Sequence, residues 1–383
     1  MGADSPPKPV LLKWVEWHAG HIKDPVGRLR FLKTVAPQIE PQSRRLRIAW
    51  RFWPVAVALL ASSFFIVRAR LHVEPLPTMV RRVRVPVLQK EGLPSVWRVE
   101  GGKDFETYSN GLRIDNHYAV SHHPRSYRAF PVERPEEAAT EPRNQPVGIV
   151  FHTTESHQAP FEAGNNRELR QAGESILDYV SRHHAYNFLI DRFGRVYRIV
   201  AESDAADHAG YSVWADADWL YVNLNESFLG VSFEARTEPG QEESAVTPAQ
   251  IRSAGMLTEM LRSRYAIPAS NCVTHAQVSV NPSNMRIGYH TDWASSFPFE
   301  QLGLPDNYAQ PSAAVLKFGF ECDPTFVSLA GAKLYAGVQL AEERLREDAA
   351  ERGLPLATYR RTLQRLYRAR FHRATSGGVE GTE

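Results

Sequence analysis

The chain has 383 residues, of which 43% are hydrophobic and 23% charged. This balance is typical of a globular protein and excludes a disordered or collagen-like chain. The formal net charge of +2 hides an uneven distribution, because residues 1–90 carry a net +11, residues 356–383 a net +4, and the stretch between them a net −13. An acidic central region repels a phosphate backbone, so we expect no nucleic-acid partner.

The chain has two cysteines, Cys272 and Cys322. This number excludes a disulfide-rich scaffold and a cysteine-rich zinc module. A single disulfide between them and two unpaired thiols are both compatible with the sequence.

The first strongly apolar segment is residues 52–67, FWPVAVALLASSFFIV, which contains no charged side chain. Extended to residues 48–70, with tryptophans at one end and arginines at the other, it predicts a transmembrane helix; a buried core helix is the alternative. A cleaved signal peptide is not expected, because the leader would be too long and no small-residue cleavage site follows. Basic residues before the segment favour a cytoplasmic N-terminus. We therefore expect a single-pass protein of the cytoplasmic membrane, with the later domain on the periplasmic or extracellular side.

The rest of the chain divides by composition. Residues 1–47 form a basic tail, residues 71–104 a proline-containing linker, residues 105–304 an α/β domain and residues 305–383 a helical extension. In the extension, apolar positions at helical spacing predict one helix around Leu334–Leu345 and another around Tyr359–Phe371. The second has a basic face, which is either solvated or in contact with an anionic lipid or polymer.

Strand and helix patterns alternate within the α/β domain. Apolar runs predict a buried strand at residues 147–151, a hairpin of residues 186–190 and 196–200, and a further strand at residues 228–235. A capping box that begins at Thr247 predicts a helix to about residue 264. The pattern indicates a mixed central β-sheet flanked by helices.

Histidines mark the ends of two predicted strands. His152 ends the first buried strand, and His275 follows the strand at residues 272–274. His290 and Asp292 come soon after, two positions apart. Two imidazoles and one carboxylate leave a fourth tetrahedral position open, which is the arrangement of catalytic zinc.

Four segments carry a resemblance to a known family. They are residues 149–154 (IVFHTT), residues 185–197 (AYNFLIDRFGRVY), residues 208–212 (HAGYS) with the strand LGVSF at 229–233, and the stretch from Thr274-His275 to Phe297-Pro298-Phe299. Together they resemble the zinc-dependent N-acetylmuramoyl-L-alanine amidases of the type 2 class and the related peptidoglycan recognition proteins, over about residues 145–304.

The resemblance implies a Zn²⁺ ion held by His152, His275 and Asp292. His290 stands where many members have lysine, and would stabilise the oxyanion together with zinc; it could instead replace Asp292 as the third ligand. His208 and Asn187 are expected to contact the substrate.

A second departure from the family is Ser232, which occupies a position where many active members have glutamate. Glu234, two residues further along the strand, or Tyr186, which matches a tyrosine of other members, would then handle the proton.

The function implied is a membrane-anchored peptidoglycan hydrolase that cleaves the amide bond between N-acetylmuramic acid and L-alanine. The alternative is a non-catalytic protein that binds or senses peptidoglycan or a muropeptide, and a structural envelope protein is a third possibility. The sequence does not indicate an oligomeric state.

Overall fold

The computed structural model describes residues 94–372, apart from residues 136, 138 and 239–244. The predicted transmembrane segment, residues 48–70, lies outside the described residues. Within the described part of the chain, no helix combines the length and the hydropathy needed to span a bilayer.

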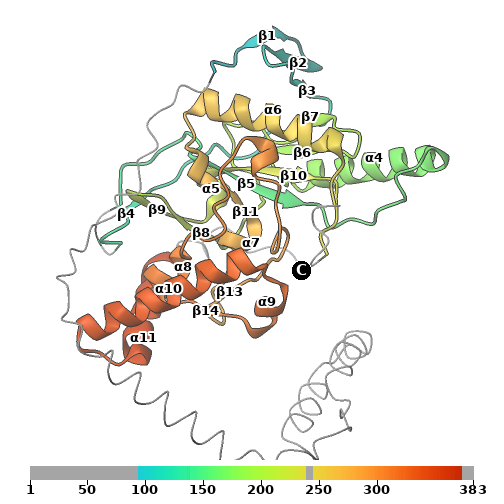
Figure 1. Cartoon of the computed structure of the whole chain (residues 1–383). Coiled ribbons are helices and arrows are strands. Elements are labelled where there is room, and N and C mark those ends of the chain that lie inside the picture. The colour runs from blue at the N-terminus through green and yellow to red at the C-terminus, as the bar shows by residue number, and fades with distance from the viewer. Residues whose placement is uncertain (1–93, 136, 138, 239–244, 373–383) are drawn as a thin grey trace, which may run out of the picture. The chain divides into compact units, whose positions relative to one another are not determined.

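A mixed eight-stranded sheet forms the centre of the domain, as predicted (Figure 1). In spatial order its strands are β1 (Arg98–Gly101), β2 (Phe105–Tyr108), β3 (Arg113–Asp115), β7 (Val196–Arg198), β6 (Phe188–Ile190), β10 (Phe228–Phe233), β5 (Gly148–Thr153) and β11 (Cys272–Thr274). β1 lies in the segment predicted as linker. It pairs with β2 in antiparallel fashion, so the sheet begins earlier in the chain than the predicted boundary at residue 105.

The half of the sheet that contains β6, β10, β5 and β11 is parallel. β10 runs parallel to both β5 and β6, and β11 runs parallel to β5. All residues of β5 and β10 are buried, which explains why these strands are continuous apolar runs rather than alternating ones. Parallel strands bring their carboxyl ends to one edge of a sheet, where ligand sites of open α/β folds are found.

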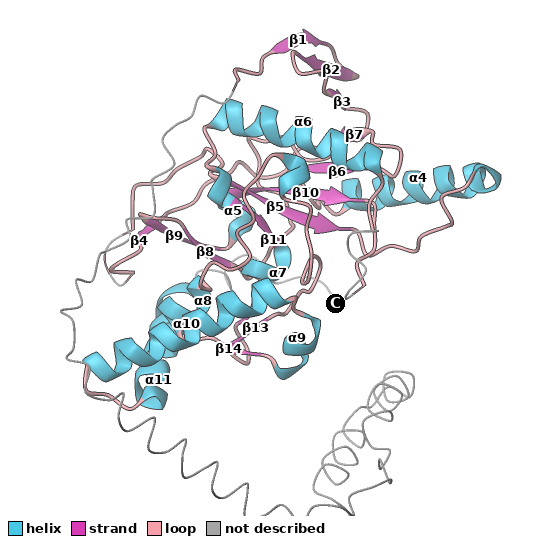
Figure 2. Cartoon of the chain, viewed as in Figure 1, coloured by secondary structure: helices cyan, strands magenta, loops and turns pink. Residues whose placement is uncertain are grey.

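Two long helices cover opposite faces of this sheet (Figure 2). Helix α4 (Asn166–Arg182) packs against Leu189 of β6, whereas α6 (Pro248–Tyr265) packs against the neighbouring Ile190. Successive side chains of a strand point to opposite faces, so the two helices sandwich the sheet. The predicted capping box at the start of α6 is present: Thr247 and Gln250 exchange hydrogen bonds, and Pro248 opens the helix.

Two small three-stranded sheets accompany the main one. One contains β4 (Phe130–Pro131), β9 (Trp219–Val222) and β8 (Val213–Ala215), and the other contains β12 (Val280–Asn281), β13 (Arg286–Ile287) and β14 (Glu321–Cys322). The short helices α5 (Leu224–Ser227) and α7 (His275–Val278) adjoin the main sheet. Single 3₁₀ turns occur at Ala163–Asn165, Ala269–Asn271 and Glu300–Leu302.

The C-terminal part is helical, with α8 (Ala313–Phe318), α9 (Pro324–Leu329), α10 (Ala332–Glu351) and α11 (Leu356–Tyr367), followed by a π turn at Arg368–His372. Its buried side chains join the same hydrophobic core as those of the sheet and α6. The predicted boundary at residue 304 is therefore a change of secondary structure within one compact unit. Cys272 and Cys322 are free thiols.

Candidate metal centre

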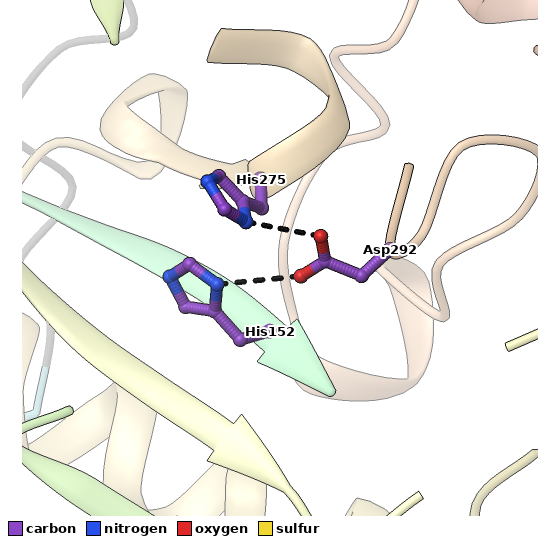
Figure 3. Close-up of side chains that lie close together, drawn as sticks. All are labelled: His152, His275 and Asp292. Atoms are coloured by element: carbon purple, nitrogen blue, oxygen red, sulfur yellow. Dashed lines mark hydrogen bonds and ion pairs between the residues drawn. The ribbon is translucent and has the colours of Figure 1, made fainter. Parts of the chain in front are cut away.

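The three predicted metal ligands converge at the carboxyl edge of the parallel strands (Figure 3). His152 lies in β5, and His275 is the first residue of α7, directly after β11. Asp292 lies in the loop that follows β13. One ligand atom from each of the three lies within 4.8 Å of the others, although up to 140 positions of sequence separate them.

The carboxylate of Asp292 bridges the two imidazoles. Its Oδ1 atom lies 3.0 Å from Nδ1 of His275, and its Oδ2 atom lies 3.3 Å from Nδ1 of His152. Two ligand atoms that share a tetrahedral zinc ion, each about 2.0–2.1 Å from it, lie about 3.3 Å apart. The spacing of these donor atoms therefore fits a small divalent cation.

The protonation states also fit a cation. The three residues are almost fully buried, with exposed fractions of 1%, 5% and 8% for His152, His275 and Asp292. Burial lowers the pKa of His152 to about 4, so its imidazole is neutral near pH 7. Burial alone would raise the pKa of Asp292, but His275 beside it holds that pKa well below its usual range. A neutral imidazole, as in His152, and an ionised carboxylate are forms that bind metals.

The hydrogen-bond network assigns the tautomer of His152. Its Nε2 atom lies 3.1 Å from Nδ1 of His208, and Nε2 of His208 lies 3.3 Å from the carbonyl oxygen of Phe228. A carbonyl can only accept, so His208 carries its proton on Nε2 and accepts at Nδ1. His152 then donates from Nε2 and has a lone pair on Nδ1, which faces the Asp292 carboxylate. Two electron-rich atoms at this distance are stabilised by a cation between them, so the residues present fit a metal ion.

Tyr186 lies beside the centre, two residues before β6. Its backbone has a φ of 65°, a left-handed conformation that is uncommon for a residue with a side chain. Its ring centroid is 5.1 Å from that of His152. Burial, followed by the negative charge of Asp292, raises the pKa of Tyr186, so its phenol is protonated at neutral pH.

The structure does not bring Glu234 to the three ligands. The Glu234 carboxylate accepts a hydrogen bond from the backbone N–H of Arg192 at 3.2 Å, and it faces Gly173 of α4. Burial raises its pKa to about 7. Strand alternation correctly indicated that Glu234 shares a face with Ser232, but Glu234 contacts the hairpin and α4.

His290 stacks on the ring of His275, with centroids 4.5 Å apart and planes 19° from parallel. Its backbone N–H donates to Oγ of Ser279. Among the described residues, the cluster that could hold a metal contains Asp292 and not His290. Burial and the neighbouring His275 lower the pKa of His290.

Asn187 was predicted to contact substrate, and its position corrects that interpretation. The side chain is fully buried; its oxygen accepts from the N–H of Gly230 at 3.0 Å, and its amide group faces the carbonyls of Val200, Ala201 and Asp204. Asn187 thus ties β10 to the loop after β7, and offers no free polar atom to a ligand. His208 is the other predicted substrate contact. Both of its ring nitrogens form hydrogen bonds within the protein, to His152 and to the carbonyl oxygen of Phe228.

Sequence reasoning missed Asn225. Its Oδ1 accepts from the backbone N–H groups of His208, Ala209 and Gly210, at 3.0, 2.6 and 3.0 Å. No motif signals this role, because an asparagine at the start of a short helix is also common as a turn residue.

Part of the chain is similar in sequence to known proteins. A family model described as N-acetylmuramoyl-L-alanine amidase matches residues 142–292. The N-acetylmuramoyl-L-alanine amidase AmiD of Escherichia coli is 29% identical over 149 residues, which are 36% of this chain and 49% of the relative. The chain thus spans about half the length of that curated relative.

Two solved structures of amidases with bound ligands have low similarity to this chain. One is E. coli AmiD with the substrate anhydro-N-acetylmuramic acid-L-Ala-D-gamma-Glu-L-Lys, at 20% identity over 58% of this chain and 82% of the other, with a TM-score of 0.32. Another is AmpDh3 from Pseudomonas aeruginosa with anhydromuramic pentapeptide, at 19% identity over 64% of this chain and 80% of the other, also with a TM-score of 0.32.

The sheet and its His–His–Asp cluster define an α/β protein with a candidate metal centre at the carboxyl ends of parallel strands. Residues 142–292 are similar to the N-acetylmuramoyl-L-alanine amidase family, in agreement with the resemblance to the type 2 class.

Proposed function

We propose that this protein is a zinc-dependent N-acetylmuramoyl-L-alanine amidase, which hydrolyses the amide bond between N-acetylmuramic acid and L-alanine in peptidoglycan. The observation that carries the proposal is the convergence of His152, His275 and Asp292 in a family-matched segment. These three residues would hold the zinc ion. When bound, zinc polarises the amide carbonyl and lowers the pKa of water, so that a nucleophile is available near neutral pH.

In this proposal, His290 assists at the carbonyl oxygen. It covers one face of the His275 ring and is itself exposed, so one of its ring nitrogens can reach a bound substrate. A lowered pKa makes the neutral imidazole the main form, and that form still donates one N–H. Such a donor stabilises the oxygen as it gains negative charge in the transition state.

Tyr186 is the better candidate than Glu234 for moving the proton. Its ring lies against His152, and its raised pKa keeps a proton on the phenol. Tyr186 would donate this proton to the nitrogen of the leaving L-alanine as the C–N bond breaks, and regain one from the attacking water. The Glu234 carboxylate, by contrast, is held at the backbone of Arg192.

The proposal includes the location of the enzyme. Residues 48–70 anchor the chain in the cytoplasmic membrane, and the amidase domain lies on the periplasmic or extracellular side, where peptidoglycan is found. The support is the uncharged run of residues 52–67 with its basic flanks.

One observation favours a second function, the recognition of muropeptide without cleavage. Ser232 occupies the family's glutamate position, and its side chain is fully buried. The centre therefore lacks a carboxylate at that position to take up a proton.

Digestion of purified sacculi by the full chain in detergent, followed by mass analysis of the soluble fragments, separates the two functions. The amidase releases stem peptides with a free L-alanine amine and leaves intact glycan strands. His275→Ala should abolish release, whereas the exposed His117→Ala should not. Binding to sacculi with no release would support the recognition function, and release of any other fragment would contradict the assigned bond.

A further inference from the structure

We infer that His208 is a positioning residue, which fixes the ring tautomer of His152 so that the lone pair on Nδ1 of His152 points at the metal. The inference rests on the proposed zinc centre. It concerns a residue outside the ligand set, which the sequence had suggested as a substrate contact.

The direction of the hydrogen-bond chain follows from its last member. The carbonyl oxygen of Phe228 cannot donate, so His208 donates to it from Nε2 across 3.3 Å. Neutral imidazole has one N–H, so Nδ1 of His208 is an acceptor, 3.1 Å from Nε2 of His152. His152 therefore carries its proton on Nε2 and has none on Nδ1, the atom that lies 3.3 Å from the Asp292 carboxylate. Partners of this kind orient metal-binding histidines and fix their tautomer.

The loop that carries His208 is held by a dedicated contact. Asn225 accepts the N–H of His208 and of the two residues after it on a single side-chain oxygen. Three donors on one acceptor fix the backbone, and so fix the origin of the His208 side chain. His208 therefore meets His152 in one orientation.

The acceptor carbonyl is also fixed. Arg125 is 2% exposed, and its Nη1 group donates to the carbonyl oxygens of Phe228 at 2.9 Å and Glu226 at 2.7 Å. A buried guanidinium paired with carbonyls keeps the start of β10 in place. The carbonyl oxygen of Phe228 thus accepts hydrogen bonds from both Arg125 and His208.

The neighbouring strand leaves room for the ring. A Cβ atom added to Gly230 would lie 2.6 Å from Cγ of His208, closer than two carbons approach without displacement. The backbone of Gly230 does not have the positive φ that would require glycine. The glycine at this point in β10 is therefore explained by the space that the His208 ring occupies.

Zinc affinity of the full chain tests this role. His208→Leu fills similar space but removes the acceptor, and should weaken zinc binding about 10- to 100-fold, as loss of an orienting partner does. His208→Asn places an amide oxygen near the position of Nδ1, and should recover most of that loss. The exposed His117→Leu is the matched control and should bind zinc as the parent does. Affinity is measured by competition with a chelator.

The tautomer of His152 in the metal-free protein, measured by NMR, tests the inference independently of zinc binding. ¹⁵N-histidine NMR of the parent should show His152 protonated on Nε2, and His208→Leu should give a mixture of tautomers. His152 protonated on Nδ1 in the parent, or unchanged affinity and tautomer in a folded His208→Leu, would overturn the inference. A parent chain that binds no zinc would contradict the proposed function instead, since the tautomer measurement needs no metal.

Discussion

His152 and Ser232 lie side by side on the parallel strands β5 and β10, in direct register. Cross-strand neighbours project to the same face of a sheet, so the Ser232 hydroxyl faces the candidate metal centre. A hydroxyl is a poor base near pH 7, whereas a carboxylate there could take up a proton. The phenol of Tyr186, two residues before β6, also carries an exchangeable proton, and its ring packs against that of His152.

Tyr186→Phe should keep zinc but lower the rate of amide hydrolysis by about 100-fold or more, the usual contribution of a positioned acid or base. Zinc content and the rate of stem-peptide release are both measured on the full chain. Tyr179→Phe is the matched control, because Tyr179 is an exposed tyrosine on α4. An undiminished rate in Tyr186→Phe would assign the proton transfer to another group.

His290→Ala should bind zinc normally and hydrolyse peptidoglycan about 100-fold more slowly, because one donor to the developing oxyanion is lost. His290→Lys supplies a donor of the family's usual type and should retain most of the activity. Metal analysis of the two variants discriminates between roles: loss of zinc from both would identify His290 as a ligand.

Glu234 should make the stability of the domain depend on pH. Its pKa in the folded chain is about 7, above the ordinary 4.5, because the carboxyl is buried. Below pH 4.5 the group is protonated in both states; as the pH rises through 7, the folded state must bury a charge, and stability is lost. The difference between the two pKa values corresponds to roughly 3 kcal/mol.

Glu234→Gln keeps an acceptor for the Arg192 N–H without the charge. Thermal unfolding should therefore show this variant to be stabilised relative to the parent at pH 8, with little difference at pH 5. The exposed Glu174→Gln on α4 is the control. Equal effects at the two pH values would show that Glu234 is not buried as a neutral acid.

The parts of the fold that depend on local sequence were predictable. The Thr247 capping box gives α6 its first residue, and the apolar run before His152 is β5. Placing a histidine at the end of such a strand was enough to suggest that it reaches the carboxyl edge of the sheet. The same reasoning singled out His275, and the family resemblance then favoured Asp292 over His290 as the third ligand.

Features that depend on contacts distant in sequence were not predictable. The hydrogen bond between His152 and His208 spans 56 positions, and it depends on a loop that Asn225 holds from α5. The burial of Asn187 likewise follows from three carbonyls that the loop after β7 brings together. β1 was missed because its four residues are all exposed, so that it has no apolar pattern.

Residues 48–70 should hold the protein in the membrane. Alkaline carbonate extraction of membranes should leave the full-length chain in the pellet, whereas a chain lacking residues 48–70 should be released. Recovery of the intact parent chain in the supernatant would show that this segment does not span the bilayer.

Zinc stoichiometry tests the central claim most directly, because the proposed chemistry depends on the three converging side chains. The full chain, purified and dialysed against metal-free buffer, should retain about one zinc per molecule by elemental analysis. His152→Ala leaves two ligands, which cannot hold the ion tightly, and should retain none under the same conditions. Stoichiometric zinc in His152→Ala, or a parent chain without zinc that still cleaves peptidoglycan, would contradict the account.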